Sequence, residues 1–258
     1  MHPVISFAEV REYQPGDETS IIDWTVTAKL NHPYVKVFEE DRELNVLLMI
    51  DVSGSSSFGA YQQSKEELLI EISALLAYSA ISNNDKVGLI FFTDKVEKYI
   101  PPKKGHSHIL RIIRELLEFT PVSKGTDLNF AFHFLNNVLK KRSVVFVLSD
   151  FMASKYGPMF RIAARKHDLI GLHIYDEREK QLPNVGLMNT IDAETGKLVW
   201  VNTTRIKTRT AYAKQFHDSY NYFRAAFLNN GADYISINTR DNYVKSLLKL
   251  FEKRMKTK

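Results

Sequence analysis

The sequence contains no cysteine among its 258 residues. This absence excludes disulfide bonds, thiolate zinc sites and cysteine nucleophiles. No apolar run approaches the ~18 residues that would cross a membrane as a helix. The first ten residues, MHPVISFAEV, have no cationic segment followed by an apolar stretch, so we expect no signal peptide. A cytoplasmic protein fits these absences.

Charge is unevenly distributed along the chain. Residues 1–45 contain nine acidic and four basic side chains, whereas residues 203–258 contain twelve basic and four acidic ones. The asymmetry fits contact between the two ends, an acidic partner for the C-terminal region, or a solvated basic helix, and the helix is the simplest interpretation. The composition, 44% hydrophobic and 25% charged, is that of a globular protein with enough apolar material for a core.

Apolar runs typical of buried strands alternate with segments of helical periodicity. The expected strands are 44–50, 86–93, 96–100, 143–151, 169–175 and 233–237. The expected helices are 61–82, 106–119, 127–140, 156–167, 205–229 and 241–255. In the first helix we expect Leu68, Ile72, Leu75, Leu76 and Ser79 to form the inward stripe. This alternation predicts an α/β fold, a doubly wound and mostly parallel sheet covered by helices on both faces.

Two segments depart from the alternation. Residues 188–203 are expected to form two short strands around the turn sequence ETGK. Residues 1–43 contain turn signals and short strand-like pieces, so we expect a small N-terminal β-rich extension that Trp24, Tyr34 and Phe38 hold to the main domain. The expected domains are therefore 1–43 and 44–258. The histidines show no metal-ligand spacing, and His106 and His108 are expected at the surface.

Oxygen-bearing side chains gather where the strands end. Asp51, Ser53 and Ser55 follow the first strand at alternate positions, so their side chains can converge in one loop. Thr126 lies in a second loop, and Asp150 ends a later strand. Ligands of doubly wound sheets bind at the carboxyl ends of the strands, and hard divalent cations prefer oxygen ligands. Two carboxylates and three hydroxyls therefore predict a metal site.

The pattern of Asp51-x-Ser53-x-Ser55 with Thr126 and Asp150 resembles the metal-ion-dependent adhesion site of von Willebrand factor A domains. The resemblance implies a Rossmann-like fold of the von Willebrand factor A type. It also implies that these five residues bind Mg²⁺ or Mn²⁺, and that an acidic residue of a protein partner completes the metal's coordination.

The flanking sequences resemble a widespread bacterial family of unknown function that is often encoded beside MoxR-type AAA+ ATPases. The tract REYQPGD, the segment DAETGKLVWVNT and the ending LLKLFEKRMK carry this similarity. The chain differs in having Ser20-Ile21 where the family commonly has an arginine before IDW. Family members also usually have several dozen residues before REYQPGD, so we expect either a trimmed chain or a short member.

Two other functions fit parts of the sequence. A magnesium-dependent hydrolase or phosphatase could use the same site, but aspartate-nucleophile phosphatases need an acid where Ser53 stands, and no general base is evident. Nucleic-acid binding fits the basic tail but lacks a motif. We therefore expect a metal-dependent protein-binding module that is not an enzyme, has no membrane span and binds no nucleic acid.

Overall fold

The computed structural model describes residues 4–41, 43–54, 64–152, 156–191 and 198–257. The chain divides into two units, Met1–Glu43 and Leu44–Lys258. In the first, β1 (Val4–Glu12) pairs antiparallel with β2 (Tyr34–Asp41), and the connection contains η1 (Thr19–Ile21) and α1 (Trp24–Leu30). The strands fit the expected β-rich extension. Helix α1 was not predicted; it begins at Asp23, whose side chain accepts hydrogen bonds from the backbone of Thr25 and Val26.

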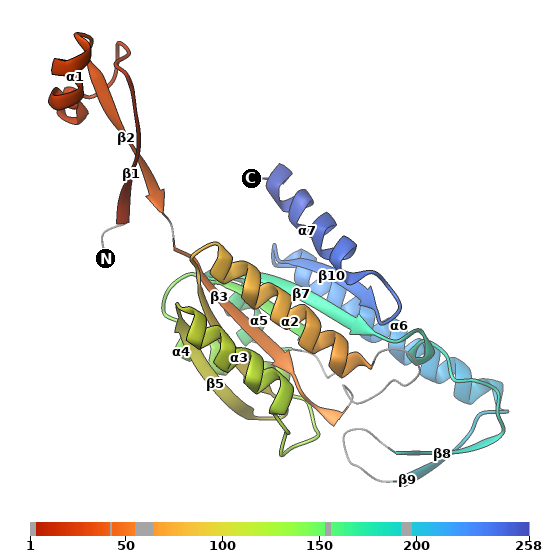
Figure 1. The fold of residues 1–258 in the computed structure, drawn as a ribbon. Coiled ribbons are helices and arrows are strands. Elements are labelled where there is room, and N and C mark those ends of the chain that lie inside the picture. Colours follow the sequence, from red (N-terminus) through yellow and green to blue (C-terminus); the bar gives the residue numbers. More distant parts are fainter. Residues whose placement is uncertain (1–3, 42, 55–63, 153–155, 192–197, 258) are drawn as a thin grey trace. The chain divides into compact units, whose positions relative to one another are not determined.

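The second unit is built on a six-stranded sheet in the order β10-β7-β6-β3-β4-β5. Figure 1 labels β3, β5, β7 and β10 of this sheet. Its strands are β3 (Asn45–Asp51), β4 (Lys86–Phe92), β5 (Val96–Lys103), β6 (Val144–Ser149), β7 (Asp168–Tyr175) and β10 (Asp233–Asn238). All neighbours are parallel except β4 and β5. Strand β5 continues through Pro101 and Pro102, beyond its predicted end, because an edge strand tolerates residues without an N–H group.

Helices cover both faces of this sheet. They are α2 (Lys65–Ser82), α3 (His106–Glu118), α4 (Leu128–Val138), α5 (Pro158–Lys166), α6 (Ile206–Asn229) and α7 (Tyr243–Thr257). A cluster of buried apolar residues lies on each face of the sheet, and alternate residues of β3 belong to the two clusters. Val46, Leu48 and Ile50 pack with α2, α3 and α7 on one face. Leu47 and Met49 pack with α4, α5 and α6 on the other face. The predicted α/β class with a mostly parallel sheet is confirmed.

A third sheet, of two short strands, is formed by the part of the chain between β7 and α6. The turn η3 (Glu177–Glu179) follows β7, and then β8 (Leu187–Ile191) pairs antiparallel with β9 (Leu198–Asn202). This pair corresponds to the two short strands expected in residues 188–203. In the part of the chain that the structure describes, no helix is both long enough and apolar enough to cross a membrane.

Two predictions about side chains were wrong. In α2, Leu75 and Ser79 are exposed, whereas Lys65 lies on the buried face with Leu68 and Ile72. The buried face of α2 is therefore rotated relative to the predicted stripe and includes a lysine. A prediction from the spacing of apolar residues does not assign a lysine to a buried face. His108 is buried rather than exposed, because its Nε2 lies 2.9 Å from the carbonyl oxygen of Val87.

Candidate functional site

The predicted site lies at the point where the order in which strands are added to the sheet reverses. Strands β3 and β6 are neighbours, but the chain continues from β3 to β4 on the opposite side. Loops that leave such a switch point diverge, which opens space beyond the carboxyl ends of the strands. Asp51 is the last residue of β3, and Asp150 immediately follows β6. The parallel fold thus brings together two acids that are 99 residues apart in the sequence.

Asp51 is a buried carboxylate with fixed hydrogen-bond donors. Its Oδ1 accepts a hydrogen bond of 3.0 Å from the backbone of Ser53, and its Oδ2 accepts one of 2.7 Å from the hydroxyl of Ser149. Burial first, and the nearby charge of Asp150 second, raise its pKa to about 6, although the hydrogen bonds offset part of this rise. A buried carboxylate close to the charge of a second carboxylate favours a cation beside them.

Asp150 is held by the turn that follows β6. Its Oδ1 accepts a hydrogen bond of 3.1 Å from the backbone of Met152. Between them, Phe151 has a φ of 50°, in the left-handed region that a bulky residue seldom adopts. Its ring stacks on Phe223 of α6 at a centroid distance of 4.2 Å, and this packing holds the turn that directs Asp150 into the site.

The other three predicted ligands are described to different extents. Ser53 is buried beside Asp51, whereas Ser55 lies outside the described residues. Thr126 is half-buried in the loop before α4. This loop is joined to the first by a hydrogen bond of 2.9 Å from the N–H of Gly54 to the carbonyl oxygen of Lys124. The loops after β3 and before α4 therefore lie side by side, and Thr126 belongs to the second.

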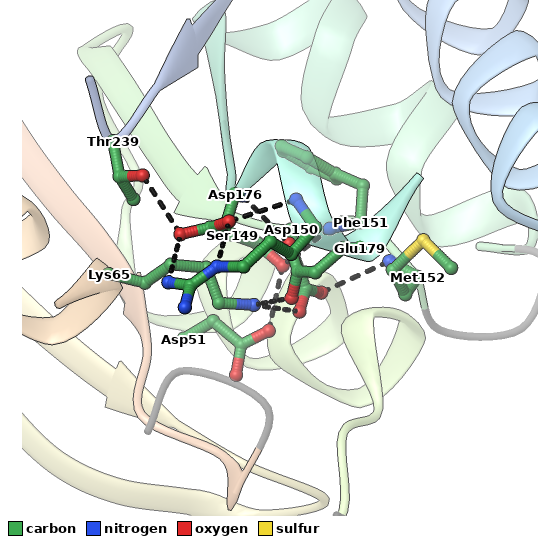
Figure 2. Close-up of polar contacts among 10 residues, drawn as sticks. Asp51, Lys65, Ser149, Asp150, Phe151, Met152, Asp176, Glu179 and Thr239 are labelled. Carbon is green, nitrogen blue, oxygen red and sulfur yellow. Dashed lines mark hydrogen bonds and ion pairs between the residues drawn. The ribbon is translucent and has the colours of Figure 1, made fainter. Parts of the chain in front are cut away.

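Two charged residues that the prediction missed also lie in the site. Lys65, at the start of α2, places its Nζ 3.2 Å from Oδ2 of Asp150 and 2.5 Å from Oε1 of Glu179 in η3 (Figure 2). Burial alone would lower the pKa of Lys65, but the two carboxylates outweigh burial and raise it. For Glu179, burial dominates and raises its pKa, with the lysine as a partial offset.

The donor set suits a hard divalent cation when hydroxyls are included. Within the described part of the chain, no group of three or more His, Cys, Asp or Glu side chains could hold a metal ion. The two carboxylates Asp51 and Asp150 would therefore need hydroxyl ligands and water, a combination that Mg²⁺ accepts. Two buried serines contact Asp51: the hydroxyl of Ser149 donates to its Oδ2 and the backbone N–H of Ser53 donates to its Oδ1, so hydroxyl-bearing residues lie beside the carboxylate as that requirement demands.

Comparison with known proteins places the chain in a family. Residues 9–222 match the family described as "Protein of unknown function DUF58", and the chain belongs to this family. Uncharacterized protein Rv1480 of Mycobacterium tuberculosis is 30% identical over 192 residues, which are 73% of this chain and 60% of that protein. Uncharacterized protein YeaD of Bacillus subtilis is 29% identical over 42% of this chain and 25% of its own length. The chain thus spans less than two thirds of these curated relatives.

Solved structures resemble the fold at low sequence identity. Conserved hypothetical protein BatB of Bacteroides thetaiotaomicron has a TM-score of 0.53 and 16% identity, over 83% of this chain and 99% of that one. An aerotolerance-related membrane protein of Bacteroides fragilis has a TM-score of 0.55 and 16% identity, over 81% and 97% of the two chains. The VWA domain of SpRpn10 has a TM-score of 0.43 and 12% identity, over 82% and 95%.

Proposed function

We propose that this chain is a divalent-metal-dependent protein-interaction module. In this proposal Mg²⁺ or Mn²⁺ is held by five residues: Asp51, Ser53, Ser55, Thr126 and Asp150. The observation that carries it is the pair of acids at the switch point: Asp51 is buried and hydrogen-bonded to the hydroxyl of Ser149, and the charge of Asp150, which is half-buried, acts on it. A bound divalent cation would supply an electrophilic centre for an acidic side chain of another protein.

The proposed partner is a protein that presents an acidic side chain to the bound metal. An acidic residue of a partner protein is the ligand that the resemblance to adhesion sites implies. A MoxR-type AAA+ ATPase is the partner or helper that the family resemblance suggests, in the assembly or remodelling of a third protein. A cytoplasmic location, expected from the sequence, belongs to this proposal as well.

Calorimetric titration with Mg²⁺ and Mn²⁺ tests the metal site. We expect saturable binding by the parent chain and its loss in Asp51→Asn, which keeps the shape of the side chain but removes its charge. Asp241→Asn is the matched control, because Asp241 also follows a strand, β10, and accepts a backbone hydrogen bond from Asn238. Equal binding by all three proteins, or no binding by the parent with acetate present as a surrogate carboxylate, would refute the proposal.

The hydrolase alternative uses the same site and needs its own assay. We propose that the chain is not an enzyme. Ser53 stands two residues after Asp51, where an aspartate-nucleophile phosphatase needs a second acid as its general acid. Incubation with p-nitrophenyl phosphate and Mn²⁺ should release no phosphate above the rate of Asp51→Asn. Turnover that this substitution abolishes would replace the binding proposal with a metal-assisted hydrolase.

A further inference from the structure

Lys65 occupies a position that is costly for a lysine. Its side chain is 1% exposed, and a buried ammonium is stable only when acidic partners compensate for the lost water. It is also the first residue of α2, after the N-cap Ser64, where the helix dipole disfavours positive charge. An apolar side chain would serve the fold at lower cost, so the charge of Lys65 calls for a reason beyond packing.

Glu179, the second partner of Lys65, is fixed independently of the lysine. Its Oε2 accepts a hydrogen bond of 2.9 Å from the backbone N–H of Asp176. Asp176 in turn accepts hydrogen bonds from the backbone of Arg178 and from the hydroxyl of Thr239, in the loop after β10. The lysine therefore lies between a carboxylate of the site, Asp150, and a carboxylate that a separate network holds in place (Figure 2).

The charges of this cluster match a divalent cation. Asp51, Asp150 and Glu179 contribute three negative charges, and Lys65 contributes one positive charge, so two negative charges remain. A divalent ion brings the cluster to neutrality, which favours binding where water does not screen the charges. A carboxylate that approaches the loaded site then meets no net negative charge.

We propose that Lys65 and Glu179 belong to the metal site as its charge-balancing pair, setting how tightly it binds a divalent cation and how well the loaded site accepts an external carboxylate. This inference rests on the proposed function. Lys65 opposes metal binding and favours the external carboxylate, whereas Glu179 has the opposite two effects. Substitutions that neutralise one partner should therefore change the two affinities in opposite directions.

The experiment compares the parent with Lys65→Met, Glu179→Gln and the double variant by calorimetric titration with Mn²⁺, with and without acetate. We expect Lys65→Met to tighten Mn²⁺ binding by about tenfold and to lose the gain that acetate gives the parent. We expect Glu179→Gln to weaken Mn²⁺ binding by about tenfold and to increase the gain from acetate. The double variant restores two negative charges, so its affinity should return to within about threefold of the parent.

The outcomes separate this inference from the proposed function. Parent binding that is lost in Asp51→Asn but unchanged in Lys65→Met and Glu179→Gln would overturn the inference and leave the metal site intact. A parent that binds no Mn²⁺, even with acetate, would overturn both. If Lys65→Met does not fold, as judged by circular dichroism, Glu179→Gln and the double variant still decide the question, because their expected affinities differ.

Discussion

At the scale of single residues, His167 is a buried base whose lost contacts with water are not replaced by hydrogen bonds within the described residues. It follows α5, and neither ring nitrogen has a hydrogen-bond partner among the residues that the structure describes. Burial first, and the charge of Lys166 second, lower its pKa to about 4. The ordinary value of about 6.5 applies to the unfolded chain, which therefore takes up a proton first as the pH falls.

The fold should consequently lose stability in acid through this residue. The contribution of neutral His167 is fully present above about pH 6.5 and is lost as the pH falls toward 4, by at most about 3 kcal/mol. We predict that His167→Asn, which is polar but does not titrate there, flattens the fall in melting temperature over this range. The exposed His217→Asn is the control and should leave the slope unchanged. Equal slopes in all three proteins would contradict the lowered pKa.

The candidate site was only partly predictable at this scale. Asp51 and Asp150 stand at the ends of strands that apolar runs mark clearly, so their meeting follows from the parallel fold. Lys65 contacts partners that are 85 and 114 residues away, and no short motif joins them. One signal was present: Lys65 is spaced three, four and seven residues before Leu68, Leu69 and Ile72, on the stripe that becomes buried.

At the scale of elements, the packing of α6 against β7 depends on a glycine. A Cβ atom added at Gly171 would lie 2.6 Å from the ring of Phe227 and 2.9 Å from the ring of Phe223. Both rings are fully buried and pack against other aromatic side chains, so they have little room to move. The close approach of the helix to the strand therefore requires a residue without a side chain at this position.

We predict that Gly171→Ala lowers the free energy of unfolding by about 1–3 kcal/mol, the usual cost of overfilling a packed core. Denaturant unfolding followed by circular dichroism measures this change. Gly125→Ala is the control, because the nearest atom to its added Cβ is 3.6 Å away, an ordinary contact distance. A Gly171→Ala protein as stable as this control would show that α6 can shift without cost.

Element types were more predictable than the contacts between elements. Aromatic residues recur every three or four positions in α6, and of these Phe216, Phe223 and Phe227 are buried, whereas Tyr212 and Tyr220 are half-buried. Helix α1 was missed because residues 24–30 combine Trp, Thr and Val, which favour strands; the cap at Asp23 and the left-handed Asn31 outweigh this preference. The sequence LIGLHIY identifies β7 as a strand but does not show which side chains require the space at Gly171.

At the scale of the whole molecule, the second unit has a core of its own. Both clusters of buried apolar residues, one on each face of the six-stranded sheet, draw all their members from residues 46–251. All five proposed metal ligands and the pair Lys65 and Glu179 also lie in this range. The described core clusters and all the proposed ligands therefore come from the second unit.

We predict that a fragment of residues 43–258 folds and binds Mn²⁺ with the affinity of the full chain, within about threefold. The fragment begins at Glu43 so that the N–H of Leu44 still donates to Asp85 and its carbonyl oxygen still accepts from Lys86. Thermal unfolding and Mn²⁺ titration of the two proteins side by side measure both properties. A fragment that folds but binds Mn²⁺ more than about tenfold more weakly than the full chain would contradict this prediction. It would mean that residues 1–42 supply a ligand or a charged group to the site around Asp51 and Asp150.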